Sequence, residues 1–304
     1  NMGRYGNAVR AAVLLTVLLQ WASGRVSPAL TATGQRKLTG AQENCDLCAD
    51  NWLLVLAAGG RTGSTSVQSM FSSVPGFEIM GEHGGFLRQH MATVEAIRLA
   101  RDLWLSDDNS WKPAWKHSDV DMHSVYCSVQ DLVRRVLFGS RYGEASPKVM
   151  GFKEIRYTNA EMMAFLGTVF PCARIVFPLR EQHLNPEVKE EEWVKYVPLE
   201  EKAEFVKMIH GKFNGTTTAL LPLETRSVED FNRILHDMVG VRGCRFNRSI
   251  HDNAEGGYHA DQAGDVVQGQ CDLSQVDFRL DEATLQRHAT LWAEVQQSGP
   301  RKAP

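Results

Sequence analysis

The sequence predicts an α/β fold with a central, mostly parallel sheet flanked by helices. Short, continuous apolar runs alternate along the chain with segments of helical periodicity, and this alternation is typical of parallel sheets built from βαβ units. The apolar runs lack polar alternation, as expected of strands that are covered on both faces. The 304 residues are 43% hydrophobic and 23% charged, which excludes collagen-like, coiled-coil and wholly disordered chains.

The N-terminal residues 1–24 have the organisation of a secretory targeting segment. Arg4 and Arg10 precede the uncharged run Ala11–Trp21, and Ala22–Gly24 offers the small residues of a cleavage site. As a helix, that run spans ~17 Å, which is short of the ~30 Å hydrocarbon core of a bilayer. We therefore favour a cleaved signal peptide, with a short uncleaved signal anchor as the alternative.

Residues 25–50 are polar and without a clear period, which is typical of a stem or linker, and a single α/β domain is expected over 51–298. The targeting segment predicts the secretory pathway and the Golgi lumen, with the segment either cleaved or kept as a type II anchor. Two N-glycosylation sequons, Asn214–Thr216 and Asn247–Ser249, agree with a glycoprotein of this pathway.

The chain has an even number of cysteines, at positions 45, 48, 127, 172, 244 and 271. In a secretory protein this favours structural disulfides, with free buried thiols as an alternative. Cys45 and Cys48 have the spacing of half a metal or redox motif, but no second CxxC completes a zinc site. Metal and redox chemistry are therefore the least favoured interpretations.

The first elements follow from apolar runs and turn residues. The run 52–58 predicts a buried strand, and a helix should begin within 59–65 and end at Met70 or Phe71. The turn 73–76 then leads to a short strand over 77–80. A helix is expected over 87–105, because apolar side chains recur on one face. These are Leu87, Met91, Val94, Ile97 and Trp104.

In the middle of the chain, Ser128 is expected to cap a helix that Gly139 ends. Its inward residues should be Val129, Leu132, Val133 and Val136. A strand over 148–153 follows, and then a helix capped by Asn159 and ended by Pro171. The run 174–179 predicts the next strand.

The last third of the chain is more polar. A helix is expected within part of 187–213, and a short strand is expected over 220–223. Ser227 should cap a helix with an apolar face, and a final helix is expected over about 281–297. The segment 250–270 is rich in Gly, Asp, Asn and Gln and is expected to be a loop.

The strongest functional signal is the succession of strand, GGRTGST loop and helix around residues 59–65. Glycines let the backbone approach a ligand closely, and the amides of such a loop together with a helix N-terminus form a cradle for an anion. Arg61 adds charge, and the Thr and Ser side chains add hydroxyl donors. The Lys of the Walker A pattern is missing, which disfavours ATP or GTP hydrolysis. The structural alternative is an ordinary glycine-rich turn.

Four segments in order resemble the sulfotransferase family. Gly60–Thr65 is similar to its 5′-phosphosulfate-binding loop, and Gly151–Arg156 is similar to a strand end of the family. Phe170–Arg180 resembles the segment whose terminal Arg binds the 3′-phosphate of the sulfate donor. Leu221–Glu224, before a helix, also fits. The resemblance covers about 52–243 and implies a P-loop-like α/β domain.

The resemblance also implies a co-substrate, 3′-phosphoadenosine 5′-phosphosulfate, and no metal. The donor-binding residues that it implies are Arg61, Thr62, Gly63, Ser64, Thr65, Ser66 and Arg180. The chain departs from the family pattern at Val188, where a second 3′-phosphate ligand is usually Ser. No RKG-type loop is found near the C-terminus either, although Arg242, Arg245 and Arg248 lie late in the chain.

The acceptor hydroxyl needs a general base, and Glu82 is the candidate. It follows the 77–80 strand, and some members of the family place a catalytic Glu similarly. The neighbouring His83 is the alternative base. Lys153 follows an apolar run and is a candidate to stabilise the leaving oxygen, although a salt-bridge role is favoured for it. Glu154 and Arg156 are expected to be structural ion-pair partners.

The sequence therefore predicts a sulfotransferase that acts on an acceptor hydroxyl. A carbohydrate acceptor is favoured, a lipid or small metabolite is the alternative, and Trp111 and Trp115 are candidates for stacking on it. The formal net charge of −3 argues against nucleic acid as a partner. A membrane is a partner only if the N-terminal anchor is retained. The competing function is a secreted, non-catalytic module that binds an anionic ligand.

Overall fold

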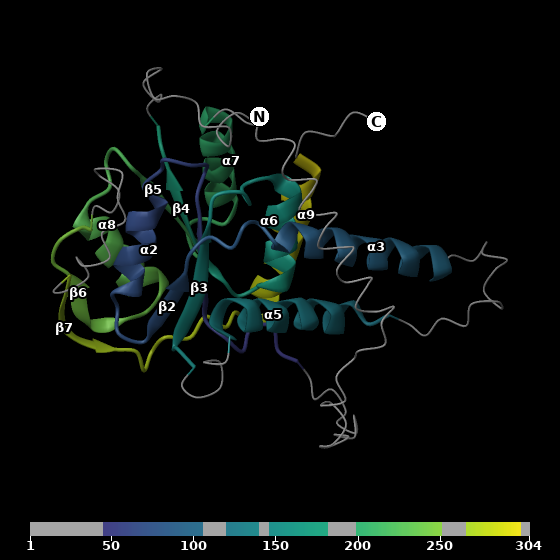
Figure 1. The fold of residues 1–304 in the computed structure, drawn as a ribbon, viewed down its shortest axis with the longest axis horizontal. Coiled ribbons are helices and arrows are strands. Elements are labelled where there is room, and N and C mark those ends of the chain that lie inside the picture. The colour runs from purple at the N-terminus through teal and green to yellow at the C-terminus, as the bar shows by residue number, and fades with distance from the viewer. Residues whose placement is uncertain (1–44, 106–119, 140–145, 182–198, 251–265, 299–304) are drawn as a thin grey trace, which may run out of the picture. The chain divides into compact units, whose positions relative to one another are not determined.

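The computed structural model describes residues 45–105, 120–139, 146–181, 199–250 and 266–298. Its centre is an all-parallel sheet of five strands in the order β2-β3-β1-β4-β5 (Figure 1). The strands are β1 (Trp52–Leu56), β2 (Phe77–Met80), β3 (Val149–Glu154), β4 (Arg174–Leu179) and β5 (Thr218–Pro222). The predicted α/β class is confirmed, and each expected strand is present.

Helices cover both faces of the sheet (Figure 1). They are α2 (Ser64–Ser72), α3 (Leu87–Leu105), α5 (Met122–Phe138), α6 (Ala160–Val169), α7 (Leu199–Lys212), α8 (Val228–Arg233), its continuation η3 (Ile234–Met238) and α9 (Glu282–Ser298). The connection from β1 to β2 runs across the sheet in the opposite direction to the later crossovers. Because parallel crossovers are right-handed, this reversal places α2 on the opposite face from α3, α5, α6 and α7.

Strand β1 shows how one apolar run forms two cores. Alternate side chains of a strand point to opposite faces. Trp52, Leu54 and Leu56 pack with the large core that includes α3, α5, α6, α7 and α9. Leu53 and Val55 pack with the core formed by α2, α8 and the strands β6 and β7. Full burial on both faces explains why this sequence shows no polar alternation.

Local signals predicted two helix starts correctly. Asn159 is the N-cap of α6 and its side chain accepts a hydrogen bond from Met162 N at 3.0 Å. Ser227 caps α8 in a capping box with Asp230, in which each side chain bonds the other's backbone. Both caps leave helical N–H groups satisfied, which fixes where each helix begins.

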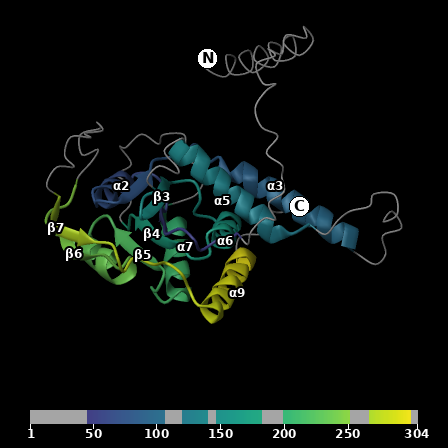
Figure 2. The same ribbon diagram turned by 90° about the horizontal axis from the view of Figure 1, so that it is seen from below.

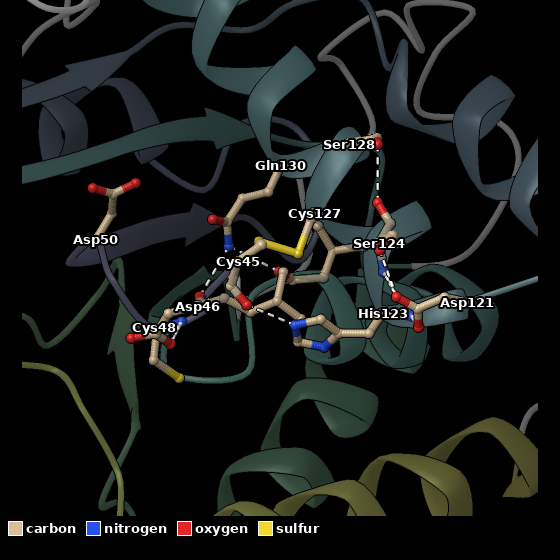
Figure 3. Close-up of a disulfide and its surroundings, with 12 residues drawn as sticks. Cys45, Asp46, Cys48, Asp50, Asp121, His123, Ser124, Cys127, Ser128 and Gln130 are labelled. Carbon is tan, nitrogen blue, oxygen red and sulfur yellow. Dashed lines mark hydrogen bonds between the residues drawn. A yellow bond between two sulfur atoms is a disulfide. The ribbon is translucent and has the colours of Figure 1, made fainter. Parts of the chain in front are cut away.

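The expected start of α5 is wrong. The helix begins at Met122, where Asp121 is the N-cap and accepts from the backbone of His123 and Ser124. Ser128 lies within the helix, and its hydroxyl donates to Ser124 O at 2.9 Å (Figure 3). Val136 is 52% exposed and so does not face inward as predicted.

The prediction of a loop over 250–270 is wrong at its C-terminal end. Strand β6 (Arg242–Phe246) pairs with β7 (Val267–Asp272) in an antiparallel hairpin, and a disulfide joins Cys244 to Cys271. Figure 2 shows the hairpin at the far end of the fold from α9. Residues 251–265 lie outside the described residues.

All six cysteines form disulfides, which confirms the structural interpretation. Cys45 pairs with Cys127 (Figure 3), whereas Cys48 pairs with Cys172, so the two members of the CxxC motif have different partners. The redox interpretation of that motif is therefore wrong. Disulfides form and persist in oxidising compartments, and three of them indicate such an environment. Within the described ranges, no helix is long and apolar enough to cross a membrane.

Residues 45–50 belong to the α/β unit, although they were expected in the stem. Besides the two disulfides, Asp50 pairs with Arg134 of α5 at 2.6 Å. Gln130 of α5 donates to Leu47 O and to Val169 O, both at 3.0 Å. These bonds attach the segment that precedes β1 to helices on one face of the sheet.

Candidate functional site

The carboxyl edge of the sheet brings the candidate residues together. Strand β1 lies between β3 and β4, and its outgoing connection leads to the opposite face from theirs. Ligands of open α/β sheets bind at such a switch point, beyond the carboxyl ends of the strands. Beyond β1, Ala57 N donates to Glu154 O at 3.0 Å and Ala58 N donates to Pro178 O at 2.9 Å. The GGRTGST loop therefore starts from a backbone that both neighbouring strands hold.

The loop makes its turn through left-handed backbone conformations. Gly59, Arg61 and Gly63 have φ values of 122°, 58° and 68°. Glycine adopts such values without strain, whereas Arg61 does so at a cost. Thr62 is fully buried, and its hydroxyl donates to Gly59 O at 3.3 Å. In this arrangement the Thr62 side chain closes the loop and does not offer its hydroxyl to a ligand.

The N-terminus of α2 faces this loop with its positive end uncompensated. Gly63 is its N-cap, no side chain caps the helix, and its first turn contains no acidic residue. Ser64 and Ser66 are buried and Thr65 is half-buried in that turn. Because the first N–H groups of a helix have no partners within it, this end attracts an anion. The predicted loop residues therefore lie together around one anion cradle.

Arg180 lies against the loop from the carboxyl end of β4. Its Nη1 donates to Arg61 O at 3.4 Å, and its Nε lies 3.7 Å from Glu224 Oε1. The Nε–H is buried and makes no hydrogen bond to the described residues. Glu224 also accepts from Glu181 N at 3.2 Å. Arg61 and Arg180, far apart in the sequence, are thus neighbours.

Arg226 is a further cation at the cradle that the sequence did not reveal. From the turn after β5, its Nη1 donates to Gly63 O at 3.1 Å. A Cβ at Gly63 would lie 2.5 Å from that nitrogen, so a larger residue there would displace the Arg226 side chain. Burial lowers the pKa of Arg226, which the charge of Glu224 partly opposes. No local pattern marks this Arg, because its role depends on the pairing of β5 beside β4.

A second group of charges lies at the carboxyl ends of β2 and β3, at the same edge of the sheet. Lys153 Nζ donates to Glu82 Oε1 at 2.5 Å, and Arg156 Nη1 donates to Glu82 Oε2 at 2.9 Å. Arg156 Nη1 also donates to Glu154 Oε1 at 2.6 Å. The register of β2 and β3, which pairs Met80 with Phe152, places these groups side by side. The expected ion pair between Glu154 and Arg156 is confirmed.

The two cations determine the state of Glu82. Burial alone would raise the pKa of this carboxyl group, but the hydrogen bonds and charges of Lys153 and Arg156 outweigh burial and lower it. Glu82 is therefore ionised at neutral pH and able to accept a proton. Its side chain is 29% exposed, so an acceptor hydroxyl can approach it. A low pKa also makes it a weak base while both pairs persist.

His83 occupies a different environment from its neighbour. Its side chain is 7% exposed, and the rings of Phe86 and Phe152 pack against it with centroids 4.6 Å and 5.0 Å away. Burial lowers its pKa, although Glu154 opposes the shift. Its Nδ1 lies 3.3 Å from the Tyr157 hydroxyl, which accepts a hydrogen bond from Leu87 N. His83 is thus a neutral, packed residue, which makes it a poorer candidate base than Glu82.

One described cluster has the spacing of a metal site. The nearest ligand atoms of Cys45, His123 and Cys127 all lie within 4.8 Å of one another. The two sulfurs are bonded to each other, however, and His123 Nε2 contacts Cys45 O at 2.7 Å (Figure 3). Metal ions bind free thiolates, so this cluster is a structural disulfide and not a metal centre. Val188, Trp111 and Trp115 lie outside the described residues.

The chain was also compared with known proteins. No family model and no curated protein sequence matches it. The assignment of function therefore depends on the residues and geometry described above.

Proposed function

We propose that the protein is a sulfotransferase that transfers a sulfuryl group from 3′-phosphoadenosine 5′-phosphosulfate to an acceptor hydroxyl, with a carbohydrate as the favoured acceptor. The observation that carries this proposal is the anion cradle at the switch point, with Arg61, Arg180 and Arg226 around one helix N-terminus. An accessible carboxylate, Glu82, follows β2 at the same edge of the sheet.

In this proposal, the cradle binds the 5′-phosphosulfate end of the donor. Backbone N–H groups at the start of α2 hold the phosphate oxygens, and the nearby guanidinium groups compensate the donor's charge. Arg180 binds the 3′-phosphate through its guanidinium group, which lies against the loop and is already positioned there by Glu224. Pre-organised donors of this kind stabilise charge that develops during group transfer.

The reaction itself is an in-line displacement at sulfur. The acceptor oxygen forms a bond to sulfur while the bond between sulfur and the bridging phosphate oxygen breaks, and 3′-phosphoadenosine 5′-phosphate leaves. Glu82 accepts the proton of the acceptor hydroxyl, and Lys153 stabilises the negative charge on the leaving oxygen. The contact between Lys153 and Glu82 supports these roles, because it places the two groups next to each other.

A non-catalytic binding module is the second candidate, and one observation favours it. Both oxygens of Glu82 are engaged by cations, which lowers the pKa of the carboxyl and weakens it as a base. A protein that only binds an anionic nucleotide needs the cradle but does not need Glu82 to accept a proton. The two functions therefore differ in turnover and not in donor binding.

A transfer assay tests the proposed function. The protein is incubated with donor labelled at sulfur, without metal, and with separate saccharide, lipid and small hydroxyl acceptors. We expect label on an acceptor and release of 3′-phosphoadenosine 5′-phosphate. Donor binding without transfer to any acceptor would instead favour the binding module. Turnover of ATP with magnesium, in place of sulfate transfer, would contradict both functions.

A further inference from the structure

The turn between α7 and β5 holds a glycosylation sequon whose two essential residues are both exposed. Asn214, Gly215 and Thr216 follow the end of α7 and precede Thr218, where β5 begins. The Asn214 side chain makes no hydrogen bond to the described residues and is exposed to solvent. Thr216 is also exposed, and its hydroxyl donates to Phe213 O at 2.9 Å. The amide that a glycan would modify is therefore accessible.

Both essential residues of the sequon also take part in the turn. Asn214 and Gly215 have φ values of 49° and 67°, and Asn tolerates this left-handed conformation better than most residues. Backbone bonds from Asn214 N to Gly211 O and from Gly215 N to His210 O then end the helix. Thr216 bonds Phe213 O through its hydroxyl, and it is also the hydroxyl-bearing residue that glycosylation requires two positions after the Asn.

The position of the turn is compatible with a large modification. It lies at the amino edge of the sheet, where Thr218 pairs with Ile175 near the start of β4. The anion cradle lies at the carboxyl edge, roughly a strand length or about 15 Å away along the sheet. The disulfides indicate an oxidising compartment, and N-glycosylation takes place in such a compartment.

We propose that Asn214 carries an N-linked glycan that projects from the amino edge of the sheet and leaves the anion cradle open. The oligosaccharide comes from a polyprenyl-diphosphate-linked donor, which the glycosylation pathway of the producing cell supplies. A bond forms between Asn214 Nδ2 and the anomeric carbon of the sugar, the amide loses one proton and the lipid diphosphate leaves. This modification does not depend on the proposed transferase function.

Trypsin provides a direct test, because cleavage after Lys212 and after Arg226 releases a peptide that contains only this sequon. The full chain is secreted from eukaryotic cells, and its 213–226 peptide is analysed before and after peptide N-glycosidase F in heavy-oxygen water. We expect the glycan on the peptide before treatment and heavy-oxygen-labelled Asp at position 214 afterwards. Recovery of the peptide from secreted protein with unmodified Asn214 would overturn the proposal.

Variants separate glycosylation from a folding effect. Thr216→Ala should abolish the modification while it keeps Asn214 in its left-handed turn, and Thr216→Ser should retain the modification. Asn247→Gln, in the other sequon, should leave the 213–226 peptide glycosylated. A glycan that persists at Asn214 in secreted Thr216→Ala protein would contradict recognition through this sequon.

Discussion

At the scale of single residues, the ionised state of Glu82 competes with its strength as a base. Lys153 and Arg156 keep its carboxylate ionised and oriented, but the same two cations lower its pKa and so its affinity for a proton. A donor phosphosulfate in the cradle would offer Lys153 a competing anion. If Lys153 then contacted the donor instead of Glu82, the pKa of Glu82 would rise, and Glu82 would be a stronger base when the donor is bound.

Glu82→Gln tests this role. We expect unchanged affinity for 3′-phosphoadenosine 5′-phosphate and a loss of turnover of about 10²–10⁴-fold, which is the usual contribution of general base catalysis. Steady-state kinetics and calorimetry measure the two quantities. Glu204→Gln, at a side chain that is 74% exposed, is the matched control and should match wild type. Full turnover by Glu82→Gln would exclude Glu82 as the base.

The pH dependence of turnover distinguishes Glu82 from His83. The pKa of Glu82 is lowered, so the carboxylate is lost only as the pH falls below the ordinary Glu value of about 4.3. We therefore expect kcat/KM, which reports the free enzyme, to remain level from neutral pH down to about that value if Glu82 is the base. Burial also lowers the pKa of His83. A decline that begins below the ordinary His value of about 6.5 but above the ordinary Glu value of about 4.3 would therefore indicate His83 as the base.

Arg226 acts on the donor through the loop, so its removal should affect donor binding more than the chemical step. We expect Arg226→Gln to weaken binding of 3′-phosphoadenosine 5′-phosphate by about tenfold or more, because a hydrogen bond to a charged group contributes ~1.5–3 kcal/mol. The KM for the donor should rise while kcat at saturating donor changes little. Arg233→Gln, nearby and 64% exposed, is the control. Equal losses in both variants would contradict a specific role for Arg226.

At the scale of elements, the fold depends on a loop that allows only one residue type at its centre. Gly63 has a φ of 68°, caps α2, and leaves no room for a side chain beside Arg226 and Leu223. The same glycine gives the loop its turn and lets the guanidinium group reach the backbone. The conformation of the loop and the charge around it are therefore coupled.

Gly63→Ala should disturb both the conformation of the loop and the position of Arg226 beside it. The left-handed conformation alone costs an alanine ~1–2 kcal/mol, and the contact with Arg226 adds to this loss of unfolding free energy. Gly84→Ala is the matched control, because Gly84 has a φ of 70° but nothing lies within 4 Å of its Cβ position. We expect thermal unfolding to show a larger loss for Gly63→Ala, and calorimetry to show loss of nucleotide binding in that variant alone. Similar stability of the two variants would contradict the coupling.

Elements with a strong local signal could be predicted from the sequence, and those that depend on tertiary pairing could not. The buried run of β1 and the caps at Asn159 and Ser227 each act through neighbouring residues. Strand β7, with the sequence VQGQCD, is largely exposed and lacks an alternating pattern. Its pairing with β6 and the disulfide across them define it as a strand.

In the candidate site, too, residues with a local sequence signal could be predicted and those that depend on tertiary pairing could not. The loop residues and Arg180 could be found from their sequence context, and the parallel strand order explains why they meet. Arg226 and the pairing of Glu82 with Lys153 could not be found, because each joins segments that only the sheet brings together. The N-cap of α5 was missed although Asp121 precedes a regular apolar pattern, so a closer search for caps would have found it.

At the scale of the whole molecule, the two ends of the sheet have separate roles. Disulfides attach the segment before β1 at the amino edge, where Cys48 pairs with Cys172 just ahead of β4. The charged groups of the candidate site lie at the carboxyl edge. The disulfides before β1 therefore place no covalent constraint on the loop of the candidate site.

The central claim is that the cradle and Arg180 form a binding site for a phosphorylated adenosine nucleotide. Calorimetric titration with 3′-phosphoadenosine 5′-phosphate, in the absence of metal, tests it most directly. We predict binding by the wild-type protein and a clear loss of affinity in Arg180→Ala and in Arg61→Ala. An absence of binding by well-folded wild-type protein, or equal affinity in wild type and both variants, would contradict the claim.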